Sequence, residues 1–223
     1  MTSKVILSIF AVTLLETCCV FGGKSVDEEF QKLQIVPDVV AKAPGSQLDV
    51  LFDCGSIDLG NTFTALQVRN RPTVSWKNAK PNELYTLIMT DPGAIEGRNP
   101  NDKEWHHWIV GNIPGNDVDK GDILTSFFPS GPPKDSGVHR YVFLLYKQSG
   151  KLDFKNQIKL GAYQIDGRSP FSTFDFAKKH NLGEAVAGNF YLTSWDESVE
   201  ELTKLINESQ LKAPPMEQFK QFK

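Results

Sequence analysis

The sequence EWHHWIVGNIPG, residues 104–115, decides the fold of this chain. It is rich in the β-favouring residues Trp, Ile and Val, and it ends in Pro-Gly, a pair typical of a turn. These features predict a β-strand from Trp105 to Asn112.

The two adjacent histidines of this strand cannot line the same site. Successive side chains of a strand point to opposite faces of the sheet. The alternation therefore predicts that Trp105, His107 and Ile109 share one face. It places His106 and Trp108 on the other face.

Four further segments have the composition and length of strands: residues 48–52, 72–76, 84–90 and 139–146. The run at 84–90 is continuously apolar, which is typical of a central strand. In the last segment, His139, Tyr141 and Phe143 share a face. Turns that contain Pro, Gly and Asn separate the segments. The middle of the chain is therefore predicted to be mainly β.

Helical periodicity is confined to the two ends of the chain. Apolar residues three or four apart cover residues 26–36, until Pro37 stops the pattern. A short helix is predicted over residues 171–180. A clearer helix begins near Asp196, where acidic residues suit the positive end of the helix dipole. Its apolar face consists of Val199, Leu202, Leu205 and Ile206.

The composition fits one globular domain with tails. The chain has 223 residues, of which 40% are hydrophobic, and this is enough to bury a core. The formal net charge is -3 and the pI is near 5.8. Nucleic-acid binding requires a basic patch for the phosphates, so we expect no nucleic-acid partner.

The beginning of the chain has the pattern of a secretory signal peptide. Lys4 precedes the apolar run VILSIFAVTLL, and small residues follow at Gly22 and Gly23. A membrane anchor is the alternative, but this run is shorter than a membrane span and Glu16 interrupts it. We therefore predict a secreted, extracellular protein with no transmembrane segment.

We predict four segments: a signal peptide at 1–22, an N-terminal extension at 24–46, the main domain at 47–209 and a mobile C-terminal tail at 210–223. Removal of the signal peptide takes Cys18 and Cys19 and leaves Cys54, so no internal disulfide can form. We expect Cys54 to be buried and inert, with a free or intermolecular thiol as the alternative. Asn207 begins the sequence Asn-Glu-Ser, a candidate N-glycosylation site.

Polar side chains can converge at the ends of the predicted strands, with Trp105 as an apolar wall: Asp91, His107, His139 and Tyr141. A carboxylate beside two imidazoles fixes their tautomers and raises their pKa values. The ring N–H groups and the tyrosine hydroxyl then donate toward a common point, and backbone N–H groups near Gly131 add to them. Such a pocket suits a phosphate or another oxyanion.

Other interpretations of the same residues stay open at this point. They can be separate core residues, each satisfied by the backbone. Two histidines and a carboxylate can also hold iron or zinc. However, the chain lacks a metal-site spacing such as His-Glu-x-x-His, and Cys54 is isolated. The Gly-x-Ser-x-Gly elbow of serine hydrolases is absent as well. We predict no metal, no cofactor and no catalytic residues, so no enzyme.

Two blocks of sequence resemble the signatures of the phosphatidylethanolamine-binding protein family. Residues 91–94 together with 104–115 resemble the first signature, and residues 130–133 together with 137–143 resemble the second. Supporting matches lie at residues 59–61, 70–76 and 186–191. The order and spacing agree over residues 48–206, which is nearly the whole of the predicted domain.

The resemblance implies a mainly β fold of two antiparallel sheets, with short helices and a C-terminal helix near the ligand site. It also implies an anion pocket that accepts the phosphate of a phospholipid headgroup. The positions that match the pocket of the family are Asp91, Trp105, His107, Gly131, Pro132, His139 and Tyr141.

One segment departs from the family pattern. From Asp91 onwards the family usually has Asp-Pro-Asp-Ala-Pro-Ser-Arg, whereas residues 91–98 of this chain are DPGAIEGR. Gly93 and Gly97 are expected to loosen this loop at the mouth of the pocket. Glu96 adds a negative charge where a phosphate would approach.

The leading hypothesis is a secreted binding protein for a phospholipid headgroup or another small anionic or hydrophobic ligand, with odorant and lipid carriers among the secreted relatives. In it His107, His139 and Tyr141 donate hydrogen bonds, Asp91 orients them and Trp105 packs on the ligand. The alternative is a secreted serine protease inhibitor or another protein-interaction regulator, with a secreted protease as its partner.

Overall fold

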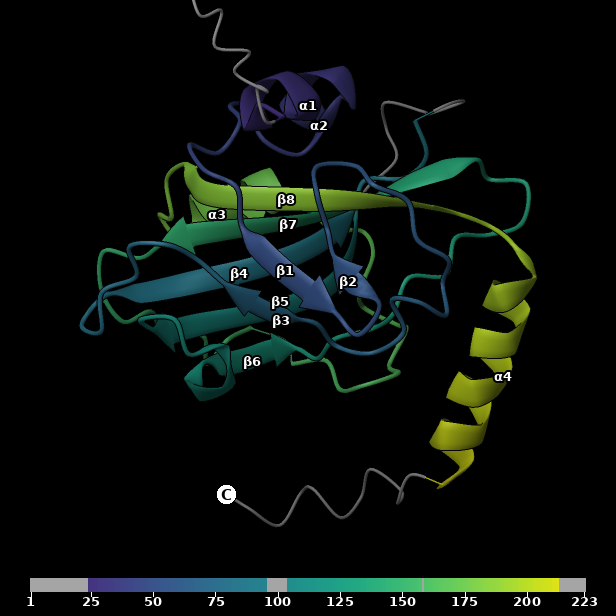
Figure 1. Cartoon of the computed structure of the whole chain (residues 1–223). Helices are drawn as coiled ribbons and strands as arrows, with labels where there is room; N and C mark the ends of the chain where they lie inside the picture. The colour runs from purple at the N-terminus through teal and green to yellow at the C-terminus, as the bar shows by residue number, and fades with distance from the viewer. Residues whose placement is uncertain (1–23, 96–103, 158, 213–223) are drawn as a thin grey trace, which may run out of the picture.

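A computed structural model describes residues 24–95, 104–157 and 159–212. A five-stranded antiparallel sheet forms its centre, with strand order β6-β5-β4-β7-β8. The strands are β4 (Leu84–Asp91), β5 (Trp105–Pro114), β6 (Asp122–Thr125), β7 (Val138–Lys147) and β8 (Ala185–Ser194). The two strong strands of the sequence, β5 and β7, lie on either side of β4 (Figure 1).

A smaller sheet covers one face of the central sheet. Its strands have the order β2-β1-β3 and are β1 (Asp49–Phe52), β2 (Gly55–Ser56) and β3 (Thr73–Ser75). Apolar side chains of both sheets form one core. Phe52 of β1, for example, meets Tyr191 of β8 edge to face, with 5.6 Å between the ring centres. The small sheet is thus held to the large one by side-chain packing.

Helices cover the opposite face of the central sheet. They are α1 (Val26–Lys32), α2 (Ile35–Asp38) and α3 (Thr173–Lys179). Phe30 and Ile35 are fully buried in a second core, together with apolar side chains of β4, β7 and β8. The central strands are buried on both faces, which explains their continuous apolar runs. The segment predicted as an N-terminal extension therefore packs on the sheet.

The buried cation Arg140 of β7 ties these N-terminal helices to the sheet. Its guanidinium donates to the carbonyls of Leu33 and Gln34 and to the carboxylate of Asp38, at 2.8, 3.1 and 2.9 Å. A charged group is retained in a protein interior when it is paired and hydrogen-bonded. Arg140 thus fixes α1 and α2 against the strand that also carries His139 and Tyr141.

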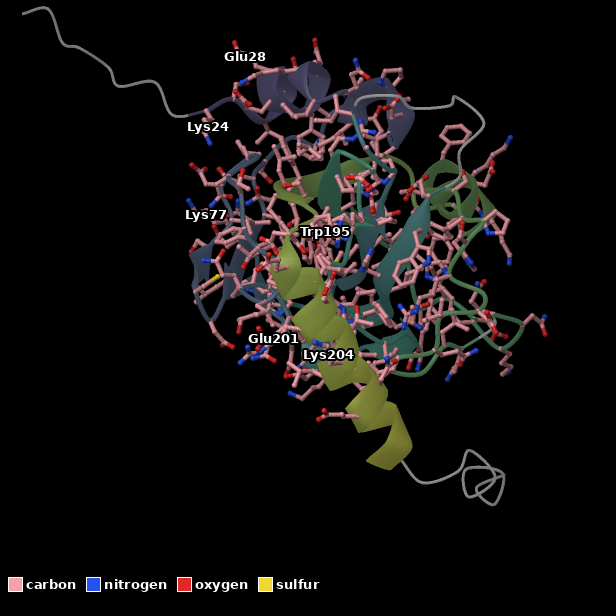
Figure 2. The ribbon with its side chains drawn as sticks, turned by 90° about the vertical axis from the view of Figure 1, so that its right-hand side faces the viewer. Lys24, Glu28, Lys77, Trp195, Glu201 and Lys204 are labelled. Carbon is pink, nitrogen blue, oxygen red and sulfur yellow. The ribbon has the colours of Figure 1, made fainter. Side chains whose placement is uncertain are left out.

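The helix α4 (Glu197–Lys212) follows β8 and lies at the side of the sheets (Figures 1 and 2). Trp195 precedes it, and the Lys134 ammonium lies 4.5 Å from the centre of the Trp195 ring. The short 3-10 helix η1 spans Val118–Lys120. In the part of the chain that the structure describes, no helix is long and apolar enough to cross a membrane. Residues 213–223 and the predicted signal peptide lie outside the described residues.

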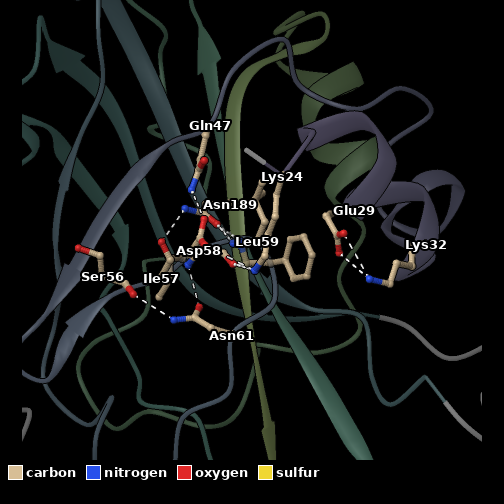
Figure 3. Close-up of polar contacts among 11 residues, drawn as sticks. Lys24, Glu29, Lys32, Gln47, Ser56, Ile57, Asp58, Leu59, Asn61 and Asn189 are labelled. Atoms are coloured by element: carbon tan, nitrogen blue, oxygen red, sulfur yellow. Dashed lines mark hydrogen bonds and ion pairs between the residues drawn. The ribbon is translucent and has the colours of Figure 1, made fainter. Parts of the chain in front are cut away.

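The buried amide of Asn189 joins β8 to the segments that run beside its outer edge (Figure 3). Its Oδ1 accepts from the N–H of Leu59 at 2.9 Å. Its Nδ2 donates to the carbonyls of Leu48 and Ile57, at 2.8 and 3.2 Å. Asn61 adds a second, more exposed bridge within the same loop. The outer edge of β8 is therefore covered by the chain itself, which prevents edge-to-edge association.

The structure confirms the predicted fold class, which is mainly β with two antiparallel sheets and short helices. It also confirms each predicted strand and the helices near both ends, with boundaries shifted by a few residues. The burial predicted for Cys54 is wrong. Cys54 is a free, exposed thiol, because it lies in the tight turn between β1 and β2. Strands β2, β6 and β8 were not predicted.

The alternation predicted that Ile109 lies on the face of Trp105 and His107, and Trp108 on the face of His106. This prediction is wrong for Ile109 and Trp108, because β5 contains a bulge. Met89 of β4 pairs with Trp108, but the next residue, Thr90, pairs with His106. His107 is therefore an extra residue, and it reverses the alternation of the strand at that point. Trp108 lies in the core between the sheets, whereas Ile109 lies in the core on the other face. The opposite orientation of His106 and His107 is confirmed.

The substitution Asn189→Ala should destabilise the fold by about 3 kcal/mol, because it leaves buried backbone N–H and carbonyl groups without partners. Urea unfolding followed by circular dichroism measures this free energy. Gln47→Ala is the matched control, since the exposed Gln47 amide bonds only to the Asp58 carboxylate, and its effect should stay below about 0.5 kcal/mol. Equal effects of the two substitutions would contradict the bridging role of Asn189.

Candidate functional site

A pocket of about 530 Å³ opens where β4 ends and β5 and β7 begin, at one end of the core between the sheets. Its volume lies in the range of small-molecule sites. All of the residues predicted for the site line it: Asp91, Trp105, His107, Gly131, Pro132, His139 and Tyr141. The structure thus brings together every residue of the predicted site. Their role in ligand binding stays a prediction.

The β-bulge at His107 brings β5 into this pocket. Because of the extra residue, Trp105 pairs with Asp91 and so shares its face of the sheet. Without the bulge, His106 would lie opposite Asp91. His106 instead points to the other side, where its Nε2 lies 3.1 Å from the carbonyl of Gly167. Bulges occur next to binding sites because they change the direction of a side chain.

Asp91 and His139 form a buried polar pair in the pocket. Asp91 Oδ2 lies 2.7 Å from His139 Nδ1, and each side chain is about one-tenth exposed. The carboxylate accepts, so Nδ1 carries the proton. The other carboxylate oxygen accepts from the N–H of Gly93 at 2.7 Å. His139 Nε2 lies 2.8 Å from Ser136 Oγ. Nδ1 is therefore bonded to Asp91, whereas Nε2 contacts a hydroxyl that also donates to the Pro133 carbonyl at 2.6 Å.

His107 has a different environment. Its Nδ1 lies 2.9 Å from the carbonyl oxygen of Phe128, and since a carbonyl only accepts, Nδ1 must donate. Burial lowers the pKa of His107 to about 4, although the charge of Asp91 acts in the opposite direction. At neutral pH the ring is therefore uncharged, with a lone pair on Nε2.

The prediction that a carboxylate raises the pKa of both imidazoles is therefore wrong for His107. The loss of hydration around this ring outweighs the attraction of the Asp91 carboxylate, whose oxygens are bonded to Gly93 and His139. The neutral ring has one proton, and it is donated to the Phe128 carbonyl, so the expectation that His107 donates to a ligand does not hold.

Tyr141 connects the pocket to the core. Burial raises the pKa of its hydroxyl well above 10, against the effect of contacts with Ser130 and the Gly131 backbone. Its ring stacks on that of Tyr191, with 5.1 Å between the centres. The Tyr191 hydroxyl in turn is hydrogen-bonded to Ser130. The Tyr141 hydroxyl is thus neutral, and the ring of Tyr191 in the core holds the Tyr141 ring in place.

Arg168 is a buried cation behind the aromatic wall of the pocket. Its charged centre lies 5.1 Å from the ring centre of Trp105 and 5.0 Å from that of Phe128. Burial lowers its pKa to about 10. It donates to backbone carbonyls of five residues: His106, His107, Ser126, Gly161 and Gln164. These bonds attach residues 161–168 to β5, next to the bulge.

Several lining residues were not predicted from the sequence: Pro92, Gly93, Phe128, Pro129, Pro133, Ile165 and Ser169. Most of them give the rim an apolar character. Ile165 and Ser169 come from a segment with few strand or helix signals, and Arg168 holds this segment in place. An arginine in a turn-rich segment gives no sign in the sequence that it will be buried.

The loop that departs from the family pattern is described only in its first part. Gly93 has a φ of 91°, which favours glycine, and an added side chain would meet no atom within 4 Å. Its N–H bonds to Asp91. Residues 96–103, and with them Glu96, Gly97 and Arg98, lie outside the described residues.

Metal binding was the main rival interpretation of this site. Within residues 24–95, 104–157 and 159–212, no group of three or more His, Cys, Asp or Glu side chains is placed to hold a metal ion.

Together, the fold and the pocket define a small β-protein with a ligand-sized cavity at one end of its central sheet. The model of the family described as "Phosphatidylethanolamine-binding protein" matches residues 41–191. The chain belongs to this family.

Three known proteins illustrate the relationship. "Putative odorant-binding protein A5" of Drosophila melanogaster is 37% identical over 187 residues, which are 83% of this chain and 88% of that protein. The "26 kDa secreted antigen" of Toxocara canis is 44% identical over 158 residues, which are 70% of this chain and 60% of that protein. Among solved structures, a carboxypeptidase Y inhibitor in complex with its cognate proteinase has a TM-score of 0.66 and 25% identity, covering 80% of this chain and 98% of that one.

The protein should lose stability as the pH falls from 6.5 to 4. Burial lowers the pKa values of His106 and His107 to about 4. Between these pH values the unfolded chain binds more protons than the folded one, so acid favours unfolding. Urea unfolding at pH 7 and 4.5 measures this loss, and each histidine should contribute about 2 kcal/mol.

The variant His106→Gln isolates one of these contributions without touching the pocket. Glutamine can keep the bonds to Gly167 and Thr125 but cannot titrate. The loss of stability between pH 7 and 4.5 should be smaller in this variant, whereas between pH 7 and 8 the two proteins should change alike. An identical loss in acid would contradict the buried, neutral state of His106.

Proposed function

We propose that this protein is a non-catalytic binding protein that holds the polar head of a small amphipathic ligand in the pocket. A phospholipid headgroup of the phosphatidylethanolamine kind and a small odorant-like molecule are the two ligand types that the family and the relatives suggest. The observation that carries the proposal is the convergence of the seven predicted residues on one ligand-sized cavity.

The character of the pocket supports an amphipathic ligand. Asp91, His107, His139 and Tyr141 make its interior polar. The prolines of the 129–133 loop, Phe128 and the exposed Ile165 make its rim apolar. Sites of this kind combine apolar walls with a few placed polar groups that orient the ligand. A polar head would therefore lie inside, with an apolar part against the rim.

The pocket contains no nucleophile activated by a base among the residues that line it. Ser136, which contacts His139 Nε2, also contacts the carbonyl of Pro133 at 2.6 Å. It is not one of the lining residues. This arrangement supports binding rather than turnover, because covalent catalysis needs a free nucleophile next to its base.

The relatives also support an extracellular place of action. One is named a secreted antigen and another an odorant-binding protein. The N-terminal pattern of Lys4 and the apolar run after it agrees with secretion. We therefore propose that the protein is secreted and acts as a carrier outside the cell.

NMR of the histidine rings tests the pocket directly. Titration with phosphorylethanolamine should give saturable shifts of His107 and His139, because both rings line the pocket. The rings of His106 and His180 should shift little, since they pack on Phe171 and Phe176, and none of these four residues lines the cavity.

Variants make this titration specific. His139→Ala should weaken the binding at least tenfold, because it removes the partner of Asp91 from a buried site. His180→Gln is the control and should leave the affinity unchanged. Absence of any shift, or equal binding by the His139→Ala variant, would contradict the proposed site.

A second candidate function rests on the structural similarity to a carboxypeptidase Y inhibitor. If this chain inhibits a secreted serine protease through its surface, pocket variants such as His139→Ala should inhibit as well as the wild type. Assays with a panel of secreted proteases measure this. Inhibition that is lost in the pocket variant, or no inhibition at all, would exclude a surface-based inhibitor.

A further inference from the structure

A second cavity runs along the edge of the small sheet, beside β3 (Figure 1). The strand order β2-β1-β3 leaves β3 paired with β1 on one side only, within the part of the chain that the structure describes. Residues 71–74 form one wall of this cavity and residues 116–119 form the other. We call it the β3 groove. It has a volume of about 390 Å³, which lies in the range of ligand sites, and it shares no lining residue with the pocket.

The main-chain N–H and C=O of Val74 point toward the outer edge of β3, along which the groove runs. Val74 lies opposite Val50 of β1. The Val50 carbonyl accepts from the N–H of Ile57 at 3.0 Å, so the peptide groups of Val50 point toward β2. Val50 and Val74 are therefore a pair without mutual hydrogen bonds, and the peptide groups of Val74 point away from β1. No described residue is hydrogen-bonded to either group.

Trp76 is the next residue whose peptide groups point to this edge, and its contacts show which chemistry the edge accepts. Asn116 Oδ1 accepts from the N–H of Trp76 at 3.2 Å, and Asn116 Nδ2 donates to the carbonyl of Trp76 at 3.3 Å. A single amide group thus makes the two hydrogen bonds that a residue of an antiparallel strand would make. Val74, two residues earlier, offers the same two groups to an amide from outside the chain.

The half-exposed cation Arg71 lies at the other end of the groove, where β3 begins. Its Nη1 donates to the carboxylate of Asp119 at 2.7 Å, and its charged centre lies 5.6 Å from the ring centre of Trp108. An exposed ion pair is weak, and a guanidinium has five N–H donors. Arg71 can therefore bind a second carboxylate beside Asp119. The remaining acid of the groove, Asp117, is paired with Lys120 at 2.7 Å.

We propose that the β3 groove binds the C-terminal end of an extended peptide, which adds to β3 as an antiparallel strand. One residue of the peptide exchanges both backbone hydrogen bonds with Val74. An antiparallel peptide runs toward the beginning of β3, so its terminal carboxylate reaches Arg71 and matches the charge there. Addition of a strand to a free sheet edge is a general mode of peptide recognition. This site goes beyond the proposed function and does not depend on it.

Titration with the peptide acetyl-Ala-Val-Ala-Ala tests the backbone pairing. In ¹⁵N–¹H correlation spectra the peptide should shift the amide signal of Val74 in a saturable way. It should also slow the exchange of this N–H with solvent, because a carbonyl of the peptide then accepts from it. Absence of a Val74 shift at peptide concentrations up to about 10 mM would overturn the inference.

Two methylated analogues make this test specific for a strand. One carries an N-methyl group on the valine and the other carries it on the alanine that follows. Alternate residues of a strand direct their N–H groups to the same edge, so only one of these two N–H groups faces Val74. One analogue should therefore bind at least about tenfold more weakly than the parent peptide, and the other should lose less. Equal binding of all three peptides would overturn the pairing with Val74.

The same peptide with a C-terminal amide tests the role of the carboxylate. The wild-type protein should bind the acid at least about threefold more tightly than the amide. Arg71→Gln should bind both forms alike. Lys77→Gln is the matched control, because it removes an exposed cation that does not line the groove, and it should keep the preference for the acid. A preference that persists in Arg71→Gln would overturn the role of Arg71.

The signals used in these titrations separate the groove from the pocket. The Val74 amide reports on the groove, whereas the rings of His107 and His139 report on the pocket. Saturation with phosphorylethanolamine should leave the affinity for the peptide unchanged. A peptide that shifts the two histidine rings but not the Val74 amide would refute the groove site and leave the proposed pocket in place.

Discussion

Strand β5 carries one residue more than its partner β4 at His107, and the geometry of the pocket depends on this bulge. The extra residue turns Trp105 to the side of Asp91 and points His106 away from it. It also brings the His107 ring to the Phe128 carbonyl, which fixes its proton on Nδ1. A single irregularity in backbone pairing thus decides which side chains line the pocket and which nitrogen His107 presents to a ligand.

The rest of the molecule holds this irregular point in place. The central sheet is packed on both faces, so the ends of β4, β5 and β7 have little freedom to move. Two buried arginines then attach chain segments to strands that carry pocket residues. Arg140 holds the N-terminal helices against β7 and Arg168 holds residues 161–168 against β5, each mainly through backbone carbonyls. Buried donors bonded to carbonyls can fix loops that have no regular structure.

Much of the fold was predictable from the sequence, because strands buried on both faces are continuous apolar runs and the turns between them contain Pro and Gly. Five of the site residues were predicted from strand alternation and the position of a turn: Asp91, Trp105, His107, His139 and Tyr141. The resemblance to a known family matched these five and added Gly131 and Pro132. The bulge was not predicted, since alternation assumes an uninterrupted strand, and its presence exchanged the faces of Trp108 and Ile109. The pKa of His107 was also mispredicted, because a sequence shows a neighbouring charge more readily than the degree of burial that opposes it. The remaining wall, with Arg168 and Ile165, depends on loop packing that has no sequence period.

The protonation state of His107 at neutral pH is the central physical claim, and ¹⁵N-detected NMR of the imidazole nitrogens tests it most directly. The two nitrogens of a neutral ring differ strongly in chemical shift, and those of a charged ring are similar. The structure predicts a neutral ring at pH 7 with the proton on Nδ1 and a lone pair on Nε2. A doubly protonated ring would contradict the account, because burial should keep this ring uncharged. A neutral ring with its proton on Nε2 would contradict it as well, because Nδ1 could then not donate to the Phe128 carbonyl.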